Sequence, residues 1–244
     1  MKAVRPTQSH RSQHGFSLVE LMVAITLGMV LLAGIVTIFV SSKHAFTLQQ
    51  GSSRAQESGR VGLFIVARVA RQAGFYGDPT QYQSVSTLFA SPNTAVSGTE
   101  GGTTNPDTLD IRYQGHQDRT IVDCLGNVVE AASMVTNTFS LGALNSSTNA
   151  RPLICTRAFP PDAALPPTTL MEGVTDFQVE YGIDTNGDSL ADQYVNADAV
   201  TNWATVHAIR IVMTTNSIDK VGAASATANR LTQTYYQTIE LRNL

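Results

Sequence analysis

The longest apolar stretch of the chain runs from Leu21 to Val40, twenty residues without a charged side chain. As an α-helix with a rise of about 1.5 Å per residue, it would span roughly 30 Å, the hydrocarbon thickness of a bilayer. Residues 1–15 carry three lysine or arginine side chains and no acidic one. Because such a basic flank stays on the cytoplasmic side, we expect the chain after Val40 to face outward across the membrane.

A second helical pattern follows the apolar stretch. Residues 41–74 contain no proline. Their apolar side chains recur at spacings of three and four, which favours one face of a helix: Val61, Phe64, Ile65 and Val69. Leu63 and Val66 widen that face, as expected where a helix packs on a sheet. Residues 73–79, Ala-Gly-Phe-Tyr-Gly-Asp-Pro, then supply a stop signal. The pattern predicts one helix over residues 16–75, with a membrane-spanning half at about 20–40 and an amphipathic half after it.

Beyond Pro79 the pattern changes to the alternation with period two that is typical of half-buried strands. Strands are predicted at 109–113, 120–122, 128–135, 153–156, 177–181, 193–195, 206–213 and 235–241. The polar segments between them are predicted to be exposed loops, at 91–106, 144–151 and 222–229. We therefore expect an α+β protein, in which the long N-terminal helix packs on an antiparallel β-sheet head with long loops, residues 76–244.

Cys124 and Cys155 are the only cysteines of the chain. Each lies at the end of a predicted strand, in the part expected to face an oxidising compartment. A disulfide between them would close a loop of about thirty residues and stabilise the head by roughly 3–4 kcal/mol in the chain-entropy model. Two free thiols are the alternative. Metal ligation is disfavoured because no other cysteine or histidine neighbours either residue.

An aspartate-rich segment, residues 184–192, places oxygen-bearing side chains at alternating positions. Calcium takes such carboxylate and carbonyl oxygens, and the candidate ligands are Asp184, Asn186, Asp188, Asp192 and the backbone carbonyl of Leu190. Two departures weaken the match to an EF-hand, because Ser189 replaces its glycine and Val195 its bidentate glutamate. The Asn-Gly pair at 186–187 is also a strong type I′ turn signal. A plain hairpin turn is therefore favoured over a calcium site.

The chain lacks the motifs of several large enzyme and nucleotide-binding classes. It has no Gly-x-Ser-x-Gly, no His-Glu-x-x-His, no phosphate-binding Gly-x-x-x-x-Gly-Lys and no dinucleotide fingerprint. Its net charge of -3 provides no basic excess for binding nucleic acid. The sequence therefore predicts a non-enzymatic protein without a cofactor and without a nucleic-acid partner.

Residues 15–20, Gly-Phe-Ser-Leu-Val-Glu, and the apolar helix after them resemble the class III signal of type IV pilins and pseudopilins. In that family a prepilin peptidase cleaves after the glycine, here Gly15, and methylates the new N-terminal amine, here that of Phe16. The glutamate at the position of Glu20 faces the amine of a neighbouring subunit during assembly. The resemblance implies that residues 1–15 are a cytoplasmic leader that is removed, while the apolar helix becomes part of a filament core.

Three further segments make the chain similar to PilW-like minor pilins. Residues 57–60, Glu-Ser-Gly-Arg, precede a turn at 71–75, Arg-Gln-Ala-Gly-Phe, and the last predicted strand leads into Leu-Arg-Asn at 241–243. The aspartate-rich turn lies between them. The resemblance implies a subunit that helps prime assembly of a type IV pilus together with other minor pilins, the major pilin and the inner-membrane assembly platform. A head of about 170 residues favours a position at or near the tip, in support of twitching or adhesion.

The implied location is the bacterial inner membrane, crossed once with the N-terminus cytoplasmic and the head periplasmic. The helix would lie in lipid before assembly and in the filament afterwards. A J-type minor pseudopilin of a type II secretion system has a similar layout. A fixed single-span periplasmic adhesin or binding protein is the alternative from another class. A secretory signal fits less well, because its apolar core is only ~7–15 residues long, and Glu20 could simply reach headgroup water.

Overall fold

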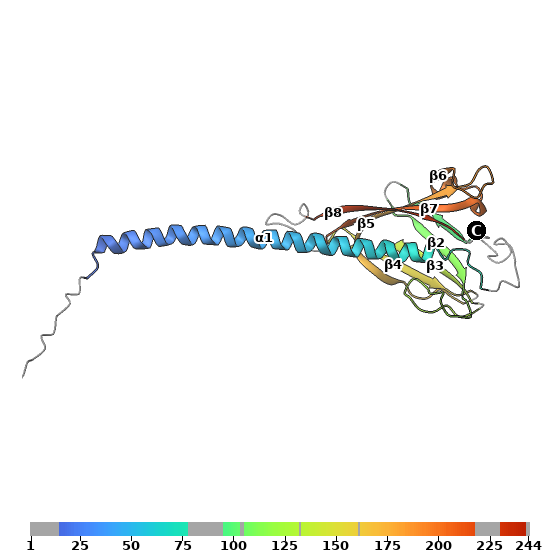
Figure 1. Cartoon of the computed structure of the whole chain (residues 1–244), viewed down its shortest axis with the longest axis horizontal. Helices are drawn as coiled ribbons and strands as arrows, with labels where there is room; N and C mark the ends of the chain where they lie inside the picture. The colour runs from blue at the N-terminus through green and yellow to red at the C-terminus, as the bar shows by residue number, and fades with distance from the viewer. Residues whose placement is uncertain are drawn as a thin grey trace, which may run out of the picture. The chain divides into compact units, whose positions relative to one another are not determined.

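The computed structural model describes residues 15–77, 95–102, 105–131, 133–160, 162–217 and 230–242. The chain divides into two units, Met1–Phe46 and Thr47–Leu244. One helix, α1 (Leu18–Ala70), contributes residues to both units (Figure 1). The leader before Gly15 and the predicted loop at 222–229 lie outside the described residues.

Eight antiparallel strands follow the helix. They are β1 (Val96–Thr99), β2 (Thr108–Gln114), β3 (Met134–Leu141), β4 (Arg151–Ala158), β5 (Thr168–Ile183), β6 (Gln193–Val195), β7 (Val206–Asn216) and β8 (Thr232–Glu240). Two short 3₁₀ helices, η1 (Ala197–Ala199) and η2 (Trp203–Thr205), separate β6 from β7. The strands form one sheet in the order β1-β2-β3-β4-β5-β7-β8, and β6 pairs with β5. The predicted fold class, a long N-terminal helix with an antiparallel sheet, is confirmed.

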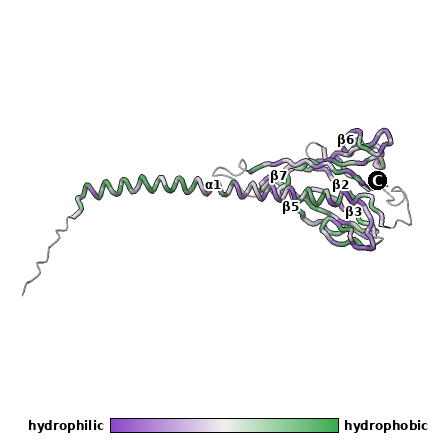
Figure 2. The backbone as a smooth tube through the Cα atoms, in the orientation of Figure 1, coloured by the Kyte–Doolittle hydropathy of each residue, from purple (hydrophilic) through white to green (hydrophobic). Residues whose placement is uncertain are grey.

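In the first unit, the described residues form the apolar half of α1 (Figure 2). This is the one apolar helical segment among the described residues that is long enough to cross a membrane, and none of it is buried. A core helix of a soluble protein would instead be mostly buried. The hydroxyls of Thr26 and Thr37 donate back to the carbonyls of Val23 and Gly34, at 2.9 and 2.7 Å. The few polar side chains are thus satisfied within the helix, as lipid requires.

The helix ends at Ala70, earlier than the predicted end at residue 75. The next turn tightens, because Gln72 and Ala73 donate their N–H groups to carbonyls only three residues back. Gly74 then adopts a left-handed φ of 72° and donates its N–H to the carbonyl of Arg112 in β2 at 2.9 Å. Glycine adopts this conformation without a steric penalty, so it ends the helix and attaches its end to the sheet.

The helix packs on the sheet through part of the predicted face, because Leu63, Val66 and Val69 are buried. Val61 and Phe64, predicted on the same face, are instead 44% and 62% exposed. The other buried residues of this half are small and were not predicted: Gly51, Ala55, Gly59, Gly62, Ala67 and Ala70. A Cβ atom added at Gly59 or Gly62 would collide with the ring of Tyr235 or the sulfur of Met171. Small residues let the sheet approach the helix closely, which apolar spacing alone does not reveal.

The strands at 109–113, 153–156, 177–181, 193–195 and 206–213 are found within β2, β4, β5, β6 and β7. The prediction at 235–241 overlaps β8, which runs from Thr232 to Glu240. The prediction at 128–135 is wrong, because the strand there, β3, begins only at Met134. The segment 120–122 forms no strand, only an isolated bridge between Val122 and Val128.

Two strands lie where polar composition predicted otherwise. β1 lies inside the predicted loop 91–106, since Val96 and Ser97 are buried although its residues are small. β3 reads Met-Val-Thr-Asn-Thr-Phe-Ser-Leu and alternates between buried and half-buried positions. One of its buried positions is Asn137. Because this residue is polar, the alternation of apolar and polar residues that marks a strand is interrupted in the sequence. The side-chain partners of Asn137 are part of the site described next.

Candidate functional site

The processing junction lies immediately before α1. Gly15, Phe16 and Ser17 are not helical, and the side-chain oxygen of Ser17 accepts a hydrogen bond from the backbone N–H of Glu20 at 3.3 Å. This is the first half of a capping box, the Ser-x-x-Glu signal of a helix start. That spacing is visible in the sequence, although Ser17 was not predicted to have a role. Phe16 is 86% exposed, and a Cβ added at Gly15 would meet nothing within 4 Å. The cap thus leaves the Gly15–Phe16 bond outside the helix and accessible.

Glu20 lies in the first turn of α1, where the helix dipole favours a negative charge. Its side chain is exposed, and no hydrogen bond or ion pair of the described residues engages its carboxylate. Its pairing with a neighbour's N-terminal amine stays a prediction.

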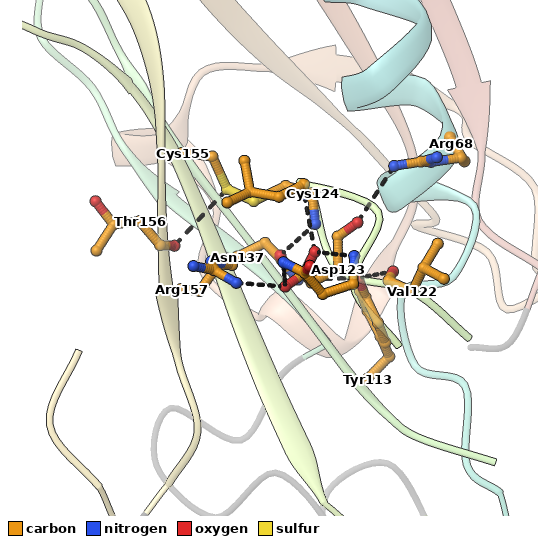
Figure 3. A network of polar contacts seen from close by, with 11 residues as sticks. Arg68, Tyr113, Val122, Asp123, Cys124, Asn137, Cys155, Thr156 and Arg157 are labelled. Atoms are coloured by element: carbon orange, nitrogen blue, oxygen red, sulfur yellow. Dashed lines mark hydrogen bonds and ion pairs between the residues drawn. A yellow bond between two sulfur atoms is a disulfide. The ribbon is translucent and has the colours of Figure 1, made fainter. Parts of the chain in front are cut away.

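The two cysteines form a disulfide, as predicted. Cys155 lies in β4, and Cys124 lies in the loop between β2 and β3. Both are buried in the core cluster. The bond therefore fixes a long loop to the sheet at a point beneath the C-terminal end of α1, the region drawn in Figure 3.

A buried carboxylate, Asp123, lies beside the disulfide (Figure 3). It accepts hydrogen bonds from the guanidinium of Arg157 at 2.8 Å and from the backbone N–H groups of Leu125 and Asn127 at 2.8 and 2.9 Å. Burial by itself would raise the pKa of Asp123. The hydrogen bonds from Arg157, Asn127 and Leu125 outweigh that cost and lower the pKa below its ordinary value.

The same loop is tied to the helix. Arg68 donates to the carbonyl of Asp123 at 3.2 Å. The amide of Gln72 donates to the carbonyl of Val122 at 3.1 Å and accepts from its N–H at 3.3 Å. Arg68 of α1 and Gln72, in the turn after it, thus hold the backbone of a loop at least fifty residues away in sequence.

The loop is also tied to the sheet. Tyr113 of β2 donates its hydroxyl to the carbonyl of Val122 at 2.7 Å, and burial raises the pKa of that hydroxyl. Asn137 of β3 donates to the same hydroxyl at 3.0 Å and accepts from the N–H of Cys124 at 2.9 Å. We call the set Arg68, Gln72, Tyr113, Asp123, Asn137 and Arg157 the helix clamp. Sequence reasoning missed all six, because each residue's partners are distant in the chain.

The aspartate-rich segment forms a nine-residue loop, because Ile183 of β5 pairs with Gln193 of β6. The type I′ turn at Asn186-Gly187 is not formed, since φ is positive at Gly187 and Ser189 but not at Asn186. Asp184 closes the loop by accepting three backbone N–H groups, from Asn186, Gly187 and Ser189. These hydrogen bonds, that from Gly187 first, lower the pKa of Asp184.

The other candidate ligands also make bonds within the loop. The side-chain amide of Asn186 donates to the carboxylates of Asp188 and Asp192, at 3.3 and 3.2 Å. Hydrogen bonds from Thr185 lower the pKa of Asp192. Within the described ranges, no cluster of three or more histidine, cysteine, aspartate or glutamate side chains is arranged to hold a metal. Calcium binding stays a prediction.

We expect calcium to leave the Tm of the full chain in detergent unchanged. The oxygens of Asp184 already accept backbone N–H groups, and the Asn186 amide already bridges Asp188 and Asp192. Thermal unfolding with millimolar calcium and with a chelator tests this. A site at one hundred times its Kd would add about 2.7 kcal/mol of stability. A rise in Tm that the chelator reverses, and that Asp188→Asn abolishes, would establish the calcium site instead.

Comparison with known families decides the identity of the chain. Residues 10–36 match the prokaryotic N-terminal methylation motif, and residues 143–243 match the family described as type IV pilus-assembly protein W. Over these two segments the chain matches PilW-like minor pilins. The first match contains the Gly15–Glu20 junction, and the second covers β4 to β8 with the aspartate-rich loop. No curated protein and no solved structure matches the chain.

For a PilW-like minor pilin, the junction and the apolar half of α1 have a clear chemical meaning. The methylation motif implies processing by a prepilin peptidase. The exposed apolar helix fits a single-pass pilin of the inner membrane. The family is one of pilus-assembly proteins, so the helix clamp and the disulfide are best understood as supports of the head.

Proposed function

We propose that this PilW-like minor pilin is a non-enzymatic subunit that joins other minor pilins to prime assembly of a type IV pilus. It remains at or near the tip, with its head in the periplasm before assembly. The observation that carries the proposal is the exposed Gly15–Phe16 bond beside a capped helix whose Glu20 carboxylate has no partner within the described residues. Each of these features suits processing and assembly.

The proposal gives Glu20 a role that its own helix cannot fulfil. A carboxylate at the edge of a bilayer loses hydration, which is costly unless an opposite charge compensates. Cleavage after Gly15 creates a new amine on Phe16. When subunits meet in the membrane, the amine of one can pair with Glu20 of the next. The pairing offsets the desolvation and sets the axial register between subunits.

The size of the head supports a tip position. A head of about 170 residues is large for a subunit that would otherwise repeat along a thin fibre. A sparse or terminal subunit escapes that packing constraint and can present its loops to a surface, in support of adhesion and twitching. The J-type pseudopilin of a type II secretion system shares this layout. The match to the pilus-assembly family over residues 143–243 favours the pilus.

We expect a strain that lacks this chain to lose twitching motility while exoprotein secretion is unchanged. Complementation with Glu20→Gln, which removes only the charge, should leave the leader cleaved but reduce surface pili on the order of tenfold, since one paired charge is worth at least ~1.4 kcal/mol here. Glu57→Gln on the same helix is the matched control, and it should restore motility. Loss of secretion instead of twitching would assign the chain to a secretion system.

A further inference from the structure

The sheet has one open edge that is not protected against pairing. Among the described residues, β8 pairs only with β7, and it lies at the end of the strand order. Its sequence, Thr-Gln-Thr-Tyr-Tyr-Gln-Thr-Ile-Glu, contains no lysine and no proline, the residues that usually blunt such edges. The opposite edge is different, because β1 has only four residues and contacts η1. One edge is blunted, and the other is a long β-prone strand.

The hydrogen-bond register shows which backbone groups of β8 face outward. Leu241 donates to the carbonyl of His207, and Ser217 donates to the carbonyl of Leu231, both at 2.8 Å. Because hydrogen-bonded pairs alternate along an antiparallel ladder, the odd-numbered residues of β8 bond to β7. The even-numbered ones direct their N–H and C=O groups away from the sheet: Thr234, Tyr236, Thr238 and Glu240. Of these, the carbonyl of Thr238 accepts a bond from the Gln237 side chain.

A groove runs between this edge and α1. Its volume is about 330 Å³, and its lining includes Arg60, Leu63, Phe64 and Arg71 of the helix and Tyr235 and Gln237 of the strand. Phe64 is 62% exposed there. A further strand paired with β8 would direct every second side chain into the groove, onto this phenylalanine. The edge offers backbone pairing, and the groove offers a place for side chains.

The charges of the groove specify the occupant. It is lined by two arginines and by no acidic residue, and Arg60 makes no ion pair or hydrogen bond within the described part of the chain. A second copy of β8 would fit poorly. Its groove-facing side chains are those of odd-numbered residues, from Gln233 to Ile239, and none is a carboxylate. The occupant therefore carries an acidic side chain that β8 itself lacks on that face.

We propose that β8 and this groove receive an extended segment of a neighbouring pilin subunit by β-strand addition. The segment pairs its backbone with the outward groups of β8, places apolar side chains on Phe64 and sets a carboxylate against Arg60. This inference rests on the proposed function, because it takes the partner from the pilins with which the chain assembles.

Cross-linking in assembling cells tests the partner. The full chain carries a photo-cross-linking amino acid at position 64, with position 128 as an exposed control far along the sequence. We expect cross-links from position 64 to another pilin, within an extended segment that contains Asp or Glu, identified by mass spectrometry. Cross-links to a second copy of this chain, to lipid only, or to no pilin while pili still form would each overturn the proposal.

Two matched pairs of variants test the contacts. Thr238→Pro removes one outward N–H at a residue that does not line the groove, whereas Thr238→Val changes the side chain and keeps that N–H. Arg60→Glu reverses the charge in the groove, whereas Arg119→Glu makes the same change at an exposed loop residue. We expect the first member of each pair to lower the yield of the cross-link about tenfold and its control to leave it unchanged.

Failure of this inference can be told apart from failure of the proposed function. All four variants should lose their leader normally and form the Cys124–Cys155 disulfide. If Thr238→Pro does not form the disulfide, it is misfolded, and Arg60→Glu then decides the outcome. Equal yields for Arg60→Glu and Arg119→Glu would overturn the β8 docking site. Retention of the leader by the wild-type chain would overturn the proposed function instead.

Discussion

A chain with Gly15→Val is expected to keep its leader and to be absent from pili. Gly15 is exposed and lies just outside the capped helix. A peptidase groove that closes on an extended glycine has no room for a β-branched side chain. A displacement of about 1 Å at a scissile bond can cost on the order of 10²-fold in rate. We therefore expect cleavage to fall by about that factor.

The measurement is mass spectrometry of the N-terminus of the membrane-extracted chain. Wild type should begin at an N-methylated Phe16, and the variant at the original N-terminus. Gly34→Val is the matched control, because a Cβ added there also meets nothing within 4 Å but lies far from the junction. If Gly15→Val were cleaved and methylated like wild type, the prepilin assignment of the junction would be wrong.

The sequence predicts the junction, the apolar helix and most of the strands because each depends on neighbours in the chain. A charge-free run, a basic flank and an alternating strand such as β7 are local patterns. The disulfide was predictable for another reason, since Cys124 and Cys155 had no other cysteine to pair with. These features need no knowledge of the tertiary structure.

The small residues of the helix face and the clamp were not predictable because they depend on contacts between distant segments. Spacing pointed to Phe64 as a core residue, yet the sheet packs where Gly59 and Gly62 let it approach. Asn137 lies outside every predicted strand, yet it is buried in β3, because Tyr113 and Cys124 satisfy its side chain. A buried polar residue is stable only with its partners, and the sequence does not show them.

The second large effect expected is on stability: Asp123→Asn should lower the free energy of unfolding by about 3–5 kcal/mol. The side chains of Asp123 and Arg157 are only 1% and 16% exposed. Removing one partner leaves the other charge buried without compensation. Arg157 has no substitute partner at hand, since its Nε–H is buried without a hydrogen bond among the described residues. One oxygen of the carboxylate accepts from the side chains of Arg157 and Asn127, and the other accepts from the backbone N–H groups of Leu125 and Asn127. An asparagine has only one side-chain oxygen and cannot accept from both groups of donors.

The measurement is denaturant unfolding of the full chain in detergent, followed by fluorescence of Trp203, the only tryptophan. Its ring packs edge-on against Tyr181 with centroids 4.8 Å apart, so its emission reports on the folded sheet. The pKa of Asp123 is lowered in the folded state. Its contribution is therefore present above the unfolded pKa of about 3.9 and is lost as the pH falls through the lower folded value. The difference between wild type and variant should shrink as the pH falls below about 4.

An exposed ion pair of nearly the same length is the control that isolates burial as the cause. Arg119 and Glu130 lie 2.9 Å apart, against 2.8 Å for Arg157 and Asp123, but their side chains are 64% and 67% exposed. Water and salt screen such a pair, so Glu130→Gln should cost less than about 1 kcal/mol. If Asp123→Asn and Glu130→Gln lowered the free energy of unfolding by similar amounts, the buried charge would not be what holds the loop between β2 and β3. A large loss for Asp123→Asn alone would establish that the clamp fixes the helix end to the sheet.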